Sequence, residues 1–210
     1  MKLELRNDIF FAKDTHAEIR ERICKQYGIS PESRIVLYAP TFRRNKSIDP
    51  YRINWSNVIP ALKEKFNNKE TTVLLRLHPN LIGSVDVSPL LNNPSVIDVT
   101  LYHDMQELLC ISDVLITDYS SSMFDFTMQR RPCLLYAVDI EKYDRGYYFD
   151  FRDLPYPVAT DEASLIENIR KFDKEKYYSD LKHFFDERVG LFEDGNASKA
   201  LGEWMLKNKF

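Results

Sequence analysis

Short, solidly apolar runs recur along this 210-residue chain, and they constrain its fold more than any other feature. They occupy residues 34–39, 71–77, 96–99, 113–117 and 133–138. Because these runs do not alternate between apolar and polar residues, they are typical of strands buried on both faces. Segments with apolar residues at helical spacing, such as Ile19, Ile23 and Tyr27, lie between them. The alternation predicts an α/β fold built on a doubly wound parallel sheet.

Capping and glycine signals mark the ends of several predicted helices. Asp14 or Thr15 can cap the first helix, Thr15 and Glu18 fit a capping box there, and Gly28 can end the helix. Later helices are expected to begin at Thr160 and Asn196. The last helix is expected to turn its apolar side chains inward: Ala200, Leu201, Trp204 and Met205.

Length and composition fit one globular domain. Hydrophobic residues make up 44% of the chain, which is enough for a substantial core, and no internal repeat or flexible linker is visible. We therefore predict a single domain over residues 1–210, with C-terminal helices from about residue 161 packing on it.

Charge and cysteine usage exclude several classes of protein. The formal net charge of −3 argues against nucleic acid as a partner. Cys24, Cys110 and Cys133 have no metal or CxxC spacing, so we expect reduced, buried thiols in a cytoplasmic protein. No signal peptide is visible, and no apolar run approaches the roughly 20 residues that span a bilayer. Such a chain can still work beside a membrane.

The stretch ISDVLITDYSSSMFD, residues 111–125, predicts a strand, a tight turn and a helix from about 120 to 129. Hydroxyls and unpaired backbone N–H groups then crowd the helix N-terminus, where the helix dipole favours phosphate. The structural alternative is a serine that caps an ordinary helix, because serine is a common N-cap residue. Both interpretations stay open at this stage.

Polar side chains follow the predicted strands where a ligand would lie, because doubly wound folds bind ligands outside the carboxyl ends of their strands. Thr41 and Arg43 follow the first strand, and Arg76 and His78 stand at the end of the second. The turn after residues 113–117 adds hydroxyl and carboxylate groups: Thr117, Asp118, Ser120, Ser121 and Ser122. We predict that these residues surround one site.

Arg76 and His78 each allow a functional and a structural interpretation. Arg76 lies in an apolar run, so it needs either a ligand anion or an internal carboxylate such as Asp118. His78 could donate to a phosphate oxygen or protonate a leaving group. A lone histidine in a loop is usually structural, but its position beside Arg76 favours function.

Common motifs for other functions are missing from the sequence. The six glycines form neither GxGxxG nor a P-loop, which argues against the usual dinucleotide and NTPase sites. No Cys/His metal spacing, no DxD pair and no GxSxG elbow occur.

Several separated motifs resemble the CDP-glycerol glycerophosphotransferase family. They are RND at 6–8, LYAPTFR at 37–43, RLHP at 76–79, ISDVLITDYSSSMFDF at 111–126, RRPCLLYAVDIEKYDRGYYFDF at 130–151 and FEDGNAS at 192–198. This family contains teichoic acid primases and polymerases, which transfer glycerol phosphate or ribitol phosphate from a CDP-linked donor to a growing acceptor. The resemblance implies a fold similar to one Rossmann-like half of a GT-B glycosyltransferase. The chain looks like the C-terminal, donor-binding half, without the N-terminal half that supplies the acceptor surface and a candidate general base.

The resemblance also implies roles for individual residues. Arg76, His78, Ser120 and Ser121 match positions that contact the donor diphosphate, and Thr41 and Arg43 are expected beside them. Weaker expectations for donor contacts fall on further residues: Thr117, Asp118, His103, Asp144 and Asp194. His78 is the expected catalytic group, which stabilises or protonates the CMP leaving group. No cofactor and no metal are expected, because Arg76, His78 and the helix N-terminus can neutralise the phosphate charge.

The implied partners are a CDP-glycerol or CDP-ribitol donor, a polyol-phosphate or glycan acceptor, and the missing half. The isolated chain is expected to bind the donor without turnover, in the cytoplasm and with peripheral contact to the inner membrane face. Two alternatives remain open. One is half of a GT-B nucleotide-sugar transferase or epimerase, and the other is a non-catalytic docking module that uses the aromatic-rich segment 143–156.

Overall fold

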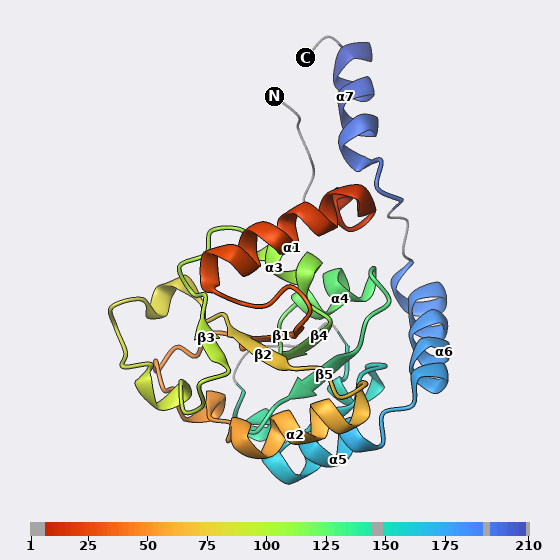
Figure 1. Cartoon of the computed structure of the whole chain (residues 1–210). Coiled ribbons are helices and arrows are strands. Elements are labelled where there is room, and N and C mark those ends of the chain that lie inside the picture. The colour runs from red at the N-terminus through yellow and green to blue at the C-terminus, as the bar shows by residue number, and fades with distance from the viewer. Residues whose placement is uncertain (1–6, 144–148, 191–193, 209–210) are drawn as a thin grey trace.

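The computed structural model describes residues 7–143, 149–190 and 194–208. Six parallel strands form one sheet in the order β3-β2-β1-β4-β5-β6 (Figure 1). The strands are β1 Arg34–Ala39, β2 Thr71–Leu75, β3 Val96–Asp98, β4 Val114–Thr117, β5 Cys133–Tyr136 and β6 Val158–Ala159. The predicted doubly wound α/β fold is therefore confirmed.

The apolar runs form strands because both of their faces are covered. All residues of β1, β4 and β5 are buried. The sequence analysis missed β6, because a strand of two residues is too short to show a pattern. Its pairing of Leu135 with Val158 and Tyr136 with Ala159 is a long-range contact that only the folded sheet creates.

Helices cover the two faces of the sheet as separate layers (Figure 1). They are α1 Lys13–Tyr27, α2 Trp55–Lys65, α3 Met105–Ile111, α4 Ser122–Thr127, α5 Glu162–Arg170 and α6 Lys174–Phe184, and a seventh helix, α7 Ala197–Lys207, follows them in the chain. Apolar residues of α1, α3, α4 and α6 belong to one core cluster, and those of α2 and α5 belong to the other. Short turns complete the chain: 3-10 helices η1 Asp8–Phe10, η2 Asp49–Tyr51, η3 Pro79–Leu81, η4 Ser88–Leu90, η5 Ile140–Lys142 and η6 Phe151–Asp153, and a π-turn η7 Phe185–Val189.

The direction in which the chain adds strands to the sheet reverses between β1 and β4. From β1 it continues to β2 and β3 on one side, and then returns to add β4, β5 and β6 on the other. Neighbouring connections therefore diverge at the carboxyl ends of β1 and β4, which opens a crevice there.

Some helix ends differ from the sequence prediction. The first helix has Ala12 at its N-cap without a side-chain cap, and the Thr15 hydroxyl instead donates to the Ala12 carbonyl (2.8 Å). Asp161 and Ser164, not Thr160, form the capping box of α5. Gly28 does end α1, in the left-handed conformation (φ 66°) that favours glycine.

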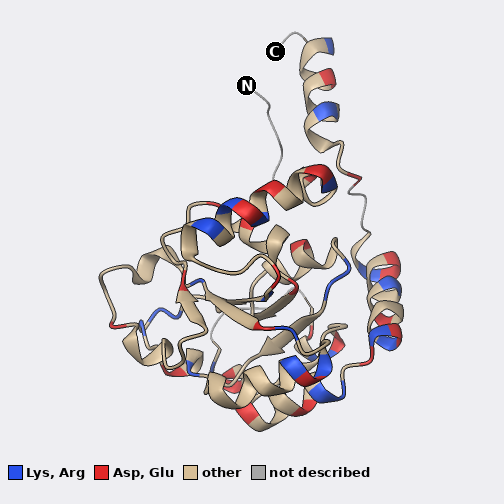
Figure 2. Ribbon diagram, viewed as in Figure 1, with Lys and Arg blue, Asp and Glu red and all other residues tan. Residues whose placement is uncertain are grey.

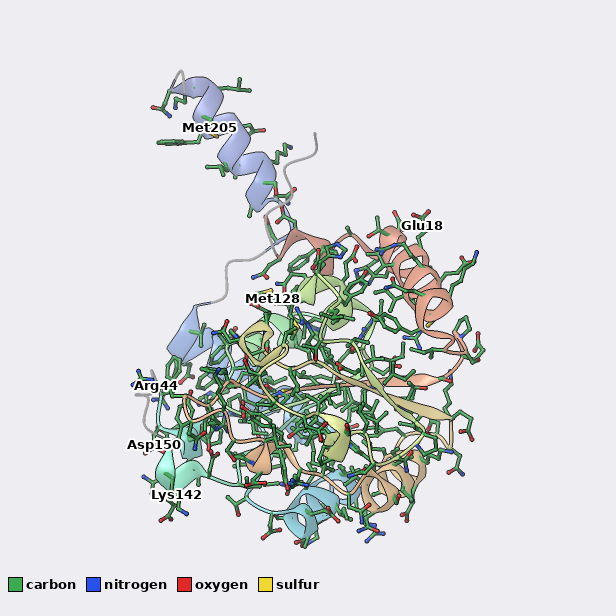
Figure 3. The ribbon with its side chains drawn as sticks, turned by 90° about the vertical axis from the view of Figure 1, so that its left-hand side faces the viewer. Glu18, Arg44, Met128, Lys142, Asp150 and Met205 are labelled. Carbon is green, nitrogen blue, oxygen red and sulfur yellow. The ribbon has the colours of Figure 1, made fainter. Side chains whose placement is uncertain are left out.

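The last helix, α7, is the main departure from prediction. It stands away from the body of the domain (Figure 1), and Figure 3 shows the same separation, with Met205 labelled on it. Leu201, Trp204 and Met205 are 42%, 54% and 37% exposed, so the predicted inward face is wrong. Asn196 is the N-cap residue but makes no side-chain cap; the Asp8 carboxylate accepts from the N–H groups of Ala197 and Ser198 instead. Helical periodicity shows an apolar face but not what covers it.

The cysteines are free and buried, as predicted. Burial raises the pKa of the Cys110 thiol to about 11, which keeps it protonated and unreactive at neutral pH. Across the described part of the chain, no helix is long and apolar enough to cross a membrane.

Candidate functional site: a cavity at the carboxyl ends of the strands

A cavity of about 840 Å³ opens at the carboxyl ends of β1, β2 and β4. It lies at the point where the sheet reverses, as expected for a ligand site in this fold. Six of the predicted site residues line it: Thr41, Arg76, His78, His103, Ser120 and Ser121. Loops far apart in the sequence therefore bring these side chains together.

Arg76 follows β2 directly and is half-buried in the cavity wall. Its guanidinium donates to the backbone carbonyl of Thr100, and no carboxylate of the described residues forms an ion pair with it. Burial lowers the pKa of Arg76, although the charge of Asp98 opposes this effect. The internal pairing with Asp118 that the sequence left open is wrong. Arg76 thus brings a positive charge that a ligand anion can neutralise.

His78 is oriented by the turn that follows it. The backbone N–H of Asn80 donates to its Nδ1 (3.2 Å), and its ring packs against Phe42 with 5.4 Å between ring centroids. Because a backbone N–H can only donate, Nδ1 carries no proton in this geometry, and Nε2 is the nitrogen that can act as a donor.

The turn between β4 and α4 presents donors without a described acceptor. The Ser122 hydroxyl donates to Ser120 Oγ (2.8 Å), while Ser121, the N-cap residue, makes no side-chain cap. The backbone N–H groups of Ser120 and Ser121 find no partner among the described residues. The simple serine-cap interpretation is therefore wrong for Ser121. Because α4 has only six residues instead of the predicted 120–129, these local donors matter more than a helix dipole.

Thr41 links the cavity to a buried ionic network. Its backbone N–H donates to Asp118 (2.8 Å), and its hydroxyl Oγ1 is buried without a hydrogen-bond partner in the described chain. An unsatisfied buried hydroxyl is costly, so an orphan in a cavity wall suggests a ligand that would complete it.

Arg43 does not line the cavity. Its guanidinium is buried between Asp118 (Nη2 to Oδ2, 2.9 Å) and Asp139 (Nε to Oδ2, 2.7 Å), and its side chain is 9% exposed. Although burial alone would lower the pKa of Arg43, hydrogen bonds to both carboxylates raise it above its usual value. Arg43 and Asp118 neutralise each other inside the fold, so neither side chain faces the cavity.

Tyrosines surround this ion pair. The guanidinium carbon of Arg43 lies 4.9 Å from the ring centroid of Tyr119 and 5.4 Å from that of Tyr143, and these two rings stack at 3.7 Å. The Tyr119 hydroxyl donates to Asp139 (3.0 Å), and both tyrosines also line the cavity. The ion pair thereby positions aromatic surface among the residues that line the cavity.

The sequence analysis missed Asp139, Tyr119, Asp104 and Asp125 as parts of the site or its support. Asp139 could have been found, because it follows the apolar run 133–138 at the same edge of the sheet as the residues that were predicted. Asp104 carries no such signal. It lines the cavity while its carboxylate caps α3 by accepting from the N–H groups of Gln106 and Glu107.

The remaining predicted residues are placed differently. Thr117 is fully buried, and its hydroxyl donates to the Ala39 carbonyl (2.7 Å), which joins β4 to β1. Asp194 lies before α7 and accepts from the N–H of Asn196 (2.9 Å), outside the cavity wall. Asp144 falls outside the described residues. The described residues contain no group of three His, Cys, Asp or Glu side chains that could hold a metal ion.

Residues 6–207 match the model of the CDP-glycerol:poly(glycerophosphate) glycerophosphotransferase family. The chain belongs to this family. Its cavity therefore lies in the fold of a family named for glycerophosphate transfer, and the predicted resemblance is confirmed.

Curated relatives support the same family. The teichoic acid glycerol-phosphate transferase of Staphylococcus aureus is 32% identical over 96% of this chain and 52% of its own length. The teichoic acid poly(glycerol phosphate) polymerase of Bacillus spizizenii is 34% identical over 96% of this chain and 51% of its own. The chain thus spans about half the length of these relatives.

Solved structures agree with the fold. The structure of the wall teichoic acid polymerase TagF matches with a TM-score of 0.73 and 31% identity, over 97% of this chain and 50% of that one. A UDP-GlcNAc 2-epimerase from Neisseria meningitidis matches with a TM-score of 0.53 at 18% identity, covering 95% of this chain and 52% of that chain. This second likeness concerns the fold alone.

Proposed function

We propose that this chain binds a CDP-linked alditol, CDP-glycerol or CDP-ribitol, with its diphosphate in the cavity at the carboxyl ends of β1, β2 and β4. The observation that carries the proposal is the convergence of Arg76, His78 and the 120–121 turn on one cavity in a member of this family. A TagF structure from crystals soaked with CDPG supports the choice of donor class.

The donor groups suit a diphosphate. Arg76 supplies a cation without a carboxylate partner, and the N–H groups at Ser120 and Ser121 supply neutral donors. Charge-assisted hydrogen bonds from such groups to phosphate oxygens are among the strongest in proteins. The unsatisfied hydroxyl of Thr41 can form its missing hydrogen bond with the same ligand.

In the proposed reaction, an acceptor hydroxyl oxygen attacks the β-phosphorus of the donor. A new oxygen–phosphorus bond forms, the bond from this phosphorus to the bridging oxygen breaks, and CMP leaves with that electron pair. Arg76 and His78 Nε2–H stabilise the negative charge that grows on the bridging and terminal oxygens. Because Nδ1 accepts a hydrogen bond from Asn80, His78 acts on CMP by donating a hydrogen bond from Nε2–H. Full transfer of a proton to CMP would require a second proton on Nδ1, and the Asn80 contact would then have to open.

Arg43, Asp118, Asp139 and Thr117 have a positioning role in this proposal. The Asp118 carboxylate holds the Thr41 N–H on one side and the Arg43 guanidinium on the other. The loop after β1 is thereby held against the turn after β4, and the wall keeps its shape when the ligand is absent. His103, which also lines the cavity, remains a predicted donor contact.

The acceptor and the base that takes its proton are proposed to come from the part of the longer relatives that this chain does not span. The acceptor would be a polyol-phosphate or glycan chain, and the transfer to it would take place in the cytoplasm at the inner membrane face. We also propose that transfer proceeds without a metal ion. Activity of the full-length enzyme should persist in EDTA, and an absolute need for Mg²⁺ would contradict this part.

Calorimetric titration of the purified chain tests the proposal. CDP-glycerol or CDP-ribitol should bind more tightly than CMP or UDP-glucose, and Arg76→Ala should weaken this binding by roughly 10- to 100-fold, the value of one charge-assisted contact. Lys46→Ala is a matched control, because it removes a cation outside the cavity wall.

Two outcomes would contradict the proposal. Equal binding of UDP-glucose and CDP-glycerol would indicate a nucleotide-sugar enzyme. Unchanged binding of CDP-glycerol in both Arg76→Ala and His78→Ala would place the donor elsewhere.

A further inference from the structure

A second cavity, of about 720 Å³, lies at the opposite, amino-terminal edge of the sheet. It is bordered by the start of β1, the end of α2, the residues before β5 and the connection from α5 to α6. Figure 1 shows the end of α2 and the α5–α6 connection side by side, and Figure 2 shows basic segments in both. The proposed donor site uses none of these residues.

The lining is basic in a chain whose net charge is −3. Six basic side chains contribute to it: Arg34, Lys65, Arg130, Arg131, Lys171 and Lys174. Three acidic residues also line it, and two of them are already engaged by backbone N–H groups. Asp113 accepts from Ile35 (2.8 Å), and Asp173 accepts from Lys176 (2.9 Å). The basic residues therefore exceed the local acids.

Arg34 at the start of β1 is the decisive residue. It is 8% exposed, yet its guanidinium forms no ion pair and donates no hydrogen bond to any described residue. Its contacts are the face of Phe66, 5.3 Å from the guanidinium carbon to the ring centroid, and the more distant charge of Asp113. Burial lowers the pKa of Arg34, and the charge of Asp113 opposes this effect.

The contrast with Arg43 shows what is missing. Arg43 is equally buried, but two carboxylates hold its guanidinium. A buried arginine without a partner is costly, and a planar guanidinium is suited to bind a phosphate through two hydrogen bonds. Lys65, Arg130 and Lys174 have no ion pair within the described part of the chain, so they can add charge at the rim.

We infer that this cavity is a second anion site, which binds the phosphate group of a phosphate ester against Arg34. The proposed function supplies one source, the phosphodiesters of a polyol-phosphate chain, and this choice of source rests on that function. The phosphate of a nucleotide has the same chemistry and is the other source. A site at the far edge of the sheet would hold a polymer away from the reacting centre and keep it on the enzyme between transfers.

Calorimetric titrations with a synthetic glycerol phosphate trimer and with CMP test the inference on the full chain. We expect the trimer to bind, with the affinity falling roughly 10- to 100-fold in Arg34→Met, which keeps an unbranched apolar side chain over Phe66. Trimer binding should be unchanged in Arg76→Ala, and CDP-glycerol binding should be unchanged in Arg34→Met. This crossed pattern separates the two sites.

Each other outcome has a defined meaning. Stronger binding of CMP than of the trimer, lost in Arg34→Met, would keep the phosphate site and identify a nucleotide as its ligand. If Arg34→Met does not fold, the rim variant Arg130→Ser/Lys174→Ser should weaken trimer binding several-fold and reduce its dependence on salt. Absence of binding by both probes to the wild type, or equal affinities in wild type and variants, would overturn the inference. Failure of CDP-glycerol to bind would contradict only the proposed function.

Discussion

The loops that follow β1 and β2 both carry an arginine at the carboxyl end of a buried strand, but they use it differently. After β1, Arg43 is enclosed by Asp118 and Asp139 and by tyrosine rings. After β2, Arg76 donates to a backbone carbonyl and keeps its charge facing the cavity. The first loop satisfies its polar groups internally and forms a wall, whereas the second leaves charge for a ligand.

This difference separates stability from binding within one site. Groups that are neutralised inside the fold should affect the free energy of unfolding when they are replaced. Groups that await a ligand should affect affinity instead. Four experiments test this separation.

The largest effect is expected for Arg43→Ala. Removing the guanidinium leaves the buried Asp118 carboxylate, 2% exposed, without its counter-charge, so the variant should lose roughly 3–5 kcal/mol of stability. Chemical denaturation measures this loss. Lys46→Ala, at an exposed position of the same loop, is the control and should change stability by less than about 0.5 kcal/mol. A stability loss below about 1 kcal/mol for Arg43→Ala would show that the ionic network does not stabilise the fold.

The converse result is expected for Arg76→Met. Because no carboxylate depends on Arg76, the free energy of unfolding should change by about 1 kcal/mol or less, while affinity for CDP-glycerol falls roughly 10- to 100-fold. Denaturation and calorimetry on the same sample measure both quantities. A large loss of stability with little loss of affinity would reverse the assignment of the two arginines.

Two hydroxyls offer a finer comparison at the carboxyl end of β4. Thr117→Val removes a buried hydrogen bond to Ala39 and should cost about 1 kcal/mol of stability with little direct effect on binding. Ser121→Ala removes an exposed hydroxyl without a described partner, so stability should stay within about 0.5 kcal/mol. Donor affinity should instead fall by a few-fold. Equal changes in stability and in donor affinity for the two variants would contradict the distinction between the two hydroxyls.

The smallest effect is expected in the pH dependence of stability. Burial alone would raise the pKa of Asp139, but hydrogen bonds and attraction from Arg43 lower it below its usual value of 3.8. A carboxylate with a lowered folded-state pKa stabilises the fold above its unfolded pKa, and this contribution is lost as the pH falls through the folded value.

The free energy of unfolding should therefore decrease below about pH 4 in the wild type and decrease less in Asp139→Asn. Denaturation curves recorded from pH 7 to pH 3 measure the difference. Parallel curves for the two proteins would show that Asp139 contributes nothing to the acid dependence.

Much of the fold was predictable because its signals are local. The runs at 34–39 and 113–117 are apolar on both faces, and only a covered sheet accommodates such strands. The cavity followed from the same reasoning, because polar residues at the carboxyl ends of parallel strands must lie along one edge. Arg76, His78, Ser120 and Ser121 were found in this way and line the cavity.

Long-range pairing was not predictable from these local signals. Nothing local decides whether Asp118 pairs with Arg43 or Arg76, because both arginines follow neighbouring strands. The position of α7 is a second case, since its apolar face fits equally well with burial or exposure.

The sequence by itself therefore determined the alternation of strands and helices, the edge of the sheet where the cavity opens and the residue types available there. Hydrophobic periodicity and strand direction are properties of short segments, and they survive without knowledge of the fold. Only the tertiary structure decided which charges are neutralised internally. Arg43 meets its carboxylates across 75 and 96 residues of sequence, whereas Arg34 and Arg76 meet none among the described residues. The free energy of a buried charge depends on the groups within a few ångströms of it, and only folding determines those neighbours.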